Sequence, residues 1–78
     1  MTYNKYKITL NSNPSSYDVS QNRTNEINRI LSSMILDEFP GIEIEITPIY
    51  NMGKTTGPEQ NTIDEINNWI SENWTAAL

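Results

Sequence analysis

The side chains most able to act on another molecule are acids and amides near the end of the chain. Residues 58–78 read PEQNTIDEINNWISENWTAAL and carry the 3.6-residue period of a helix with one apolar stripe. A polar ridge lies on another side of this helix, with Trp69 beside it, and consists of Asn61, Glu65, Asn68 and Glu72. The apolar stripe consists of Ile63, Ile66, Ile70, Trp74 and Ala77. Such a helix can pack on its own domain and still present carboxylates to a cationic partner.

Little else in the sequence is suited to catalysis or to metal binding. The chain contains no histidine and no cysteine, which removes the usual general base near neutral pH and the commonest metal ligands. Residues 53–57, GKTTG, resemble part of a phosphate-binding loop, but they lack its leading glycine and do not run from a strand into a helix, so we interpret them as a plain loop. A catalytic pair of carboxylates, as in glycosidases, remains an alternative, although 78 residues leave little room for a substrate cleft. We therefore expect a protein that is not an enzyme and that uses no metal or other cofactor.

The charge of the chain is unevenly distributed. Residues 1–36 contain four bases and two acids, a formal charge of +2, whereas residues 37–78 contain one base and eight acids, a formal charge of −7. The second half should repel nucleic acid and attract basic surfaces, so direct nucleic-acid binding is not expected. The alternative is that these acids only keep a small domain soluble. Because the sequence shows neither a signal peptide nor a membrane span, we expect a cytoplasmic protein.

The first half of the chain predicts a strand followed by a helix. The alternation of apolar and polar residues over Tyr3–Leu10 is typical of a half-buried strand. The residues expected to face inward are Tyr6, Ile8 and Leu10. The helix is expected to begin at Asp18, which would form a capping box with Gln21, and to end at Phe39-Pro40-Gly41. Its apolar stripe consists of Ile27, Ile30, Leu31, Met34 and Ile35.

The second half predicts one clear strand, a less regular connection and the final helix. The strand covers Gly41–Thr47 and is followed by Pro48, which marks a strand end or an edge position. Its inward residues would be Ile42, Ile44 and Ile46. Residues 49–52 could form a third short strand through Ile49, Tyr50 and Met52, and residues 51–57 are expected to be a flexible connection. The final helix would start at Pro58, or later at a capping box that begins at Thr62.

These elements predict a single α+β domain over residues 1–78 with the order β-α-β-(β)-α. A strand, a helix and a second strand of one sheet connect with a right-handed crossover, so the first two strands should be parallel. Since each helix has one apolar stripe, we expect a small mixed sheet of two or three strands with both helices on one face. Lys5 and Lys7 would then lie near Glu43 and Glu45 on the open face.

The order and spacing of these elements resemble those of the DinI-like family of bacterial damage-response proteins. The matching stretches are IEIEITPIYN after EFPG, and EINNWISENW near the end. The similarity covers almost the whole chain, although a Phe-Pro after a helix is common and no single motif is diagnostic.

The resemblance implies a partner and a surface. DinI-like proteins are small SOS-regulated proteins that bind RecA and modulate its filament on single-stranded DNA and its co-protease activity toward LexA-like and UmuD-like substrates. In the family, the acidic face of the last helix contacts RecA where DNA would lie. That role would fall here on Glu65, Glu72 and Asp64, with Asn61, Asn68 and Trp69 alongside, in a monomer. One departure is that residues 75–78, TAAL, lack the further acidic and aromatic run with which the family's final helix often ends.

Alternatives remain open for both the protein and its side chains. The chain could be an acidic DNA-mimic inhibitor of a host nuclease or DNA-binding protein, encoded by a phage or prophage, or a self-associating structural protein. The acids at Glu65 and Glu72 could be only the solvated side of a terminal helix. Trp69 could anchor an interface or cap the edge of the core, whereas Trp74 lies within the apolar stripe and is expected in the core.

Overall fold

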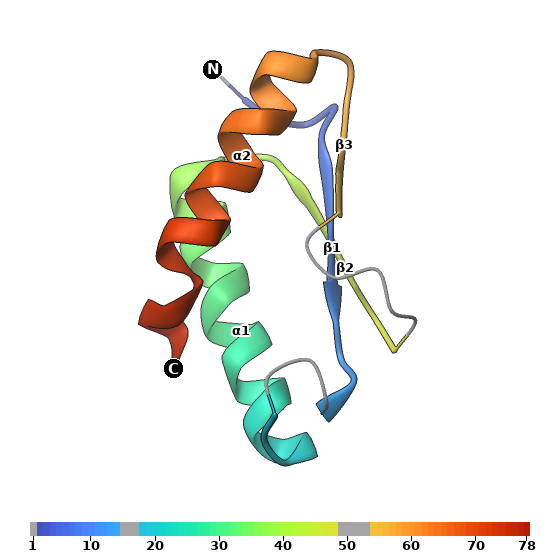
Figure 1. Cartoon of the computed structure of the whole chain (residues 1–78). Helices are drawn as coiled ribbons and strands as arrows, with labels where there is room; N and C mark the ends of the chain where they lie inside the picture. The colour runs from blue at the N-terminus through green and yellow to red at the C-terminus, as the bar shows by residue number, and fades with distance from the viewer. Residues whose placement is uncertain (1, 15–17, 49–53) are drawn as a thin grey trace.

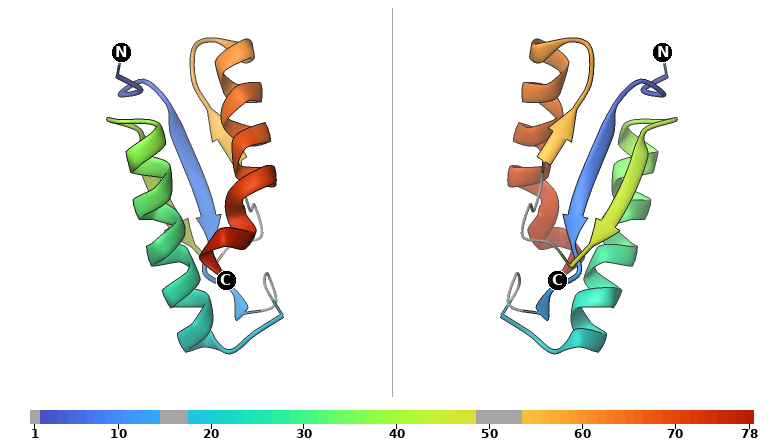
Figure 2. Two further views of the ribbon diagram at one scale, coloured as in Figure 1. Left: turned by 90° about the vertical axis from the view of Figure 1, so that its left-hand side faces the viewer. Right: turned by 90° about the vertical axis from the view of Figure 1, so that its right-hand side faces the viewer.

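The fold is a three-stranded sheet covered on one face by two helices (Figures 1 and 2). The computed structural model describes residues 2–14, 18–48 and 54–78. In chain order the elements are β1 Lys7–Asn11, α1 Gln21–Glu38, β2 Glu43–Thr47, β3 Lys54–Thr56, α2 Gln60–Asn73 and the short 3-10 helix η2 Trp74–Ala77. The predicted α+β class and the order β-α-β-β-α are confirmed.

The sheet is mixed, with strand order β2-β1-β3. β1 pairs with β2 in parallel, with Lys7 opposite Glu43, and pairs with β3 antiparallel, with Lys7 opposite Thr56. The parallel pairing of the first two strands was predicted and follows from the helical crossover between them. In the right-hand view of Figure 2, both helices lie behind the sheet, α1 behind β2 and α2 behind β3. Among the described residues, no helix or strand covers the opposite face of the sheet, which we call the open face.

The core lies between the sheet and the two helices, and the predicted apolar stripes fill it. Its largest fully buried apolar side chains are Ile8 and Leu10 of β1, Ile27, Leu31 and Ile35 of α1, and Ile66 of α2. Ile30 and Met34, also in the predicted stripe, are partly buried and pack against this cluster. The period of the apolar residues therefore identified the buried face of both helices correctly.

The start of the first strand and the start of the first helix were predicted wrongly. β1 begins at Lys7 instead of Tyr3, because the amide of Tyr6 donates to the carbonyl of Tyr3 at 3.0 Å and closes a turn there. α1 is capped by Ser20, whose hydroxyl accepts from the amide of Arg23 at 3.2 Å. Asp18 precedes this cap with a φ of 55° and does not form the expected box with Gln21.

The end of α1 follows the sequence closely. Phe39 is the C-cap residue and its amide donates to the carbonyl of Ile35 at 2.7 Å. Gly41 then adopts a φ of +89°, a conformation that other residues rarely adopt and that turns the chain into β2. The carbonyl of Pro40 accepts from the amide of Tyr3 at 2.7 Å, which ties the segment before β1 to this turn.

The expectation that Ile46 faces a covered core is wrong. Ile42 is buried and Ile44 is partly buried, but 49% of Ile46 is exposed. β2 is an edge strand of the sheet in the described residues, and Ile46 lies in an open groove beside α1. Alternation along a strand predicts which face a side chain belongs to, but not whether that face is covered.

The third strand and the last helix also begin at unexpected residues. β3 lies at Lys54–Thr56, inside the segment predicted to be a plain, flexible loop, while the predicted strand residues 49–52 lie outside the described residues. α2 begins at Gln60, with Glu59 at the cap position and no side-chain cap bond. Neither predicted start is correct, because Pro58 precedes the helix and Thr62 is a buried residue within it.

Candidate functional site

α2 is fixed to the domain by one apolar side and one polar contact. Ile66 is fully buried, and Ile63 and Ile70 pack beside it against the core. The hydroxyl of Thr55 in β3 donates to the side-chain oxygen of Asn67 at 2.7 Å, so α2 is also joined to the edge of the sheet. These contacts set the rotation of the helix about its axis and thereby determine which residues face solvent.

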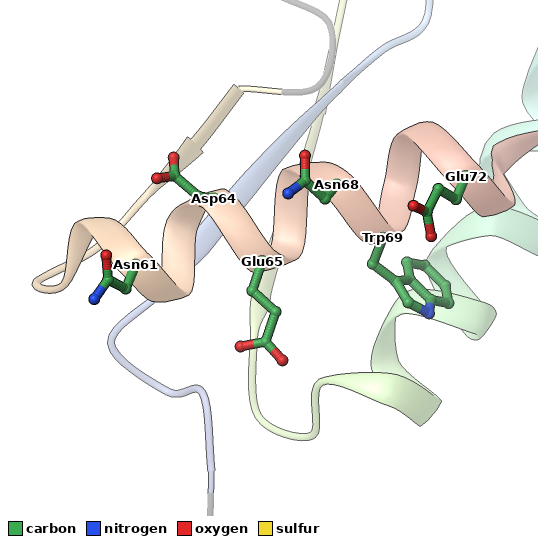
Figure 3. A pocket seen from close by; sticks show the side chains of 6 residues that line it. All are labelled: Asn61, Asp64, Glu65, Asn68, Trp69 and Glu72. Carbon is green, nitrogen blue, oxygen red and sulfur yellow. The ribbon is translucent and has the colours of Figure 1, made fainter.

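The six predicted site residues lie together on the outward face of α2. They line one shallow depression, and Figure 3 shows their side chains on the same side of the helix: Asn61, Asp64, Glu65, Asn68, Trp69 and Glu72. We call this surface the acidic face. Asp64 and Asn68 lie along one margin and Glu65 and Trp69 along the other (Figure 3). The geometric condition for a common contact surface is therefore met, since none of the three carboxylates turns into the core.

The acidic carboxylates of this face have no cationic partner among the described residues. Asp64, Glu65 and Glu72 are all exposed, and none of them forms an ion pair among the described residues. Asp64 accepts one neutral hydrogen bond, from the side-chain amide of Gln60 at 2.9 Å. No lysine or arginine follows residue 54 in the sequence, so α2 supplies no cation of its own. Three carboxylates on one exposed face attract cationic groups of another molecule.

Trp69 joins the acidic face to the core. Its ring packs edge-on against Phe39, with ring centres 5.5 Å apart and planes at 83°, and Phe39 packs in the same way against Tyr3 at 5.1 Å. Trp69 is only half-buried, so it caps the edge of the core and also borders the depression. Trp69 can therefore both cap the core and contribute to an interface, because the contact with Phe39 orients the ring while the rest of the ring remains accessible.

The acids of the open sheet face have a different environment. Lys7 forms ion pairs with Glu45 at 3.1 Å and Glu43 at 3.8 Å, as expected from the parallel register. The hydrogen bond from Lys7 to Glu45, followed by the charges of Glu45 and Glu43, raises the pKa of Lys7 above its ordinary value of 10.5. Lys5 lies in the turn before β1 and forms no ion pair among the described residues, so Lys7 alone pairs with these acids there.

The described residues contain no group of three or more His, Cys, Asp or Glu side chains placed to hold a metal ion. Within the GKTTG segment, Lys54–Thr56 form β3 and do not lead directly into a helix N-terminus, so these residues lack the geometry of a phosphate loop. Among the described helices, none is long and apolar enough to cross a membrane.

A second surface was not anticipated from the sequence. Leu36 is 45% exposed and lies with Ile46 in a groove between α1 and β2. Arg29 and Ser32 of α1 line the same groove. A signal was available, because Leu36 falls outside the predicted stripe of α1, but only the strand order shows that Ile46 lies beside it at the sheet edge.

Comparison of the chain with protein-family models, with curated proteins and with solved structures found no match.

Proposed function

We propose that this protein is a non-enzymatic regulator of the bacterial SOS response that binds RecA through the acidic face of α2. It would act in the cytoplasm as a monomer and modulate the RecA filament on single-stranded DNA and its co-protease activity. The observation that carries the proposal is the group of three exposed carboxylates, Asp64, Glu65 and Glu72, which have no ion pair among the described residues.

The charge of this face supports a partner that normally binds DNA. A protein that binds single-stranded DNA offers a positively charged groove, and that groove attracts carboxylates for the reason that it attracts phosphates. The segment after β3 contains four acids and no base, whereas the charge of the whole chain is −5. The attraction is therefore directed through α2, which favours an encounter in one orientation.

The fold supports the choice of RecA within this class of partners. The resemblance to DinI-like proteins rests on the order of a strand, a helix, a strand, a connection and a terminal helix, and the elements of this chain occur in that order. The residues that the resemblance assigns to the contact are the same six that line the depression on α2. Residues 75–78, TAAL, carry no acidic side chain, so the negative potential at the end of the chain is weaker than in family members whose last helix ends in acids.

The proposal can be tested by titrating the protein onto RecA filaments assembled on single-stranded DNA. We expect saturable binding at low salt that weakens as the salt concentration rises, because exposed charges are screened beyond about 8 Å at 0.15 M ionic strength. Filament survival and repressor self-cleavage, followed in the same samples, would show whether the bound protein stabilises or dismantles the filament. An absence of binding at low salt would refute the proposal.

The acidic face also favours a second candidate, an inhibitor that imitates DNA and blocks a nuclease or another DNA-binding protein. The two candidates share the carboxylates and differ in the partner. Capture from bacterial lysates, with and without prior DNA damage, separates them: enrichment of RecA supports the first, and enrichment of a nuclease supports the second.

A further inference from the structure

We infer that the outer edge of β2 is a docking site for an extended segment of another protein, with basic residues on one side and aliphatic residues on the other. The site is formed by β2 together with Leu36 and Arg29 of α1 and is separate from the acidic face. The partner segment would add as a further strand beside β2.

The backbone of β2 supplies the hydrogen-bonding groups for such a strand. The amide of Glu43 donates to the carbonyl of Tyr6 at 3.0 Å, and the carbonyl of Thr47 accepts from the amide of Ser12 at 2.9 Å, so these two residues face β1. Because backbone groups alternate along a strand, those of Ile44 and Ile46 point to the opposite side. No strand pairs with that side of β2 among the described residues.

On the face of the sheet that carries the helices, the edge of β2 offers an apolar surface to the added strand. Ile46 is 49% exposed and Leu36 is 45% exposed, and both line one groove between β2 and α1. In the right-hand view of Figure 2, β2 forms the border of the sheet and α1 lies behind it. A strand added to β2 would place every second side chain over this groove, where an aliphatic residue buries surface against Leu36 and Ile46.

On the open face of the sheet, the acidic side chains of β2 select a basic partner. Glu43 and Glu45 share the single ammonium group of Lys7, which leaves one net negative charge among these three residues on the open face of the sheet, and the two acidic side chains remain 69% and 50% exposed. Lysine or arginine on that face of the added strand would lie opposite these carboxylates. Opposite charges across neighbouring strands stabilise the pairing.

The same charges argue against a second copy of this chain as the occupant. In antiparallel pairing of two β2 strands, the registers with the greatest overlap place Glu45 opposite Glu45 of the other copy, or Glu43 opposite Glu45. Like charges directly opposite one another destabilise a strand pair. Acidic side chains on an edge strand are a common protection against self-association, and that protection does not act against a basic strand.

The test uses a fluorescent synthetic peptide in which valine and lysine alternate, added to the full chain labelled with nitrogen-15. We expect saturable binding, with chemical-shift changes and slowed amide exchange at Ile44 and Ile46 and shift changes at Leu36. A peptide of the same sequence with methylated backbone nitrogens on alternate residues should not bind, because it cannot form the ladder.

Variants of the protein separate this site from the acidic face. Ile46→Pro removes an amide that faces away from β1, so circular dichroism should stay unchanged while peptide affinity falls about tenfold or more. Glu65→Lys with Glu72→Lys should retain peptide affinity within about twofold at 0.15 M salt, where charges beyond about 8 Å are screened. The inference is overturned by shifts confined to residues 61–72, by equal binding of the methylated peptide or of Ile46→Pro, by no binding, or by self-association of the protein at this edge.

Discussion

At the scale of single residues, the acids of this protein differ according to whether a cation lies beside them. Glu43 and Glu45 on the sheet contact Lys7, whereas Asp64, Glu65 and Glu72 on α2 have no ion pair among the described residues. The acids of the sheet share the charge of one lysine, whereas the acids of α2 present their full charge to a partner. The sequence predicted both groups, because the helical crossover makes the first two strands parallel and the helical period groups the acids of α2.

The Lys7 pairs predict a defined loss of stability at high pH. The pKa of Lys7 is raised in the folded state, above all by its hydrogen bond to Glu45, so its contribution is complete below the unfolded-state value of 10.5. That contribution is lost as the pH rises through the higher folded-state pKa. The difference in free energy of unfolding between the wild type and Lys7→Met, measured by urea titration, should therefore shrink in alkaline solution. A difference that grows with pH would contradict this account, and using a difference cancels the titration of the tyrosines.

At the scale of elements, the fold was predictable where the apolar period is strong and failed at the boundaries. The stripes Ile27–Ile35 and Ile63–Ile70 identified the buried sides of both helices. The helix starts were missed because several residues near each start can cap a helix, and the local sequence does not show which of them does so. β3 was missed because Lys54–Thr56 is short and lacks an apolar side chain, so its pairing with β1 is decided by tertiary contacts.

The cap of α1 can be tested by comparing two substitutions. Ser20→Ala should lower the free energy of unfolding by about 1 kcal/mol, because the amide of Arg23 loses the hydroxyl oxygen that it donates to. Asp18→Gly should cost little, because Asp18 does not cap the helix and its positive φ of 55° suits glycine. Urea titrations of both variants check the order, and a larger loss for Asp18→Gly would mean that the cap has been misassigned.

The turn from β3 into α2 depends on a close approach of the backbone to an aromatic ring. A methyl group at Gly57 would overlap the ring of Tyr6, which is buried with 6% exposure. We expect Gly57→Ala to cost about 3 kcal/mol, the upper end for overpacking, since the ring or the strand must move. Gly41→Ala is the matched control: its methyl group would meet neighbours at 3.5 Å, so only the strain of the positive φ, about 1 kcal/mol, should be felt. Thermal melts of the two variants distinguish these costs, and equal melting temperatures would contradict the close approach.

At the scale of the whole molecule, the sheet fixes two surfaces that point to different partners. α2 lies over the β3 end of the sheet and turns its acidic face to solvent. β2 forms the edge of the sheet away from β3 and has an apolar groove beside it. The acidic face could be predicted because the helical period alone groups its residues. The groove could not, because it joins Leu36 and Ile46 across a strand order that the sequence does not specify.

The most direct test of the central claim compares two double variants that change the net charge equally. Glu65→Lys with Glu72→Lys reverses charges on the acidic face, and Asp37→Lys with Glu38→Lys reverses two exposed acids at the end of α1. Both pairs should keep the circular dichroism spectrum of the wild type. The measurement is the affinity of each protein for RecA filaments on single-stranded DNA over a range of salt concentrations. Our account predicts a loss of about tenfold or more, with a weaker salt dependence, for the α2 variant and affinity close to that of the wild type for the α1 variant. Equal affinity of all three proteins, or an equal loss in both variants, would show that the acidic face is not the contact surface.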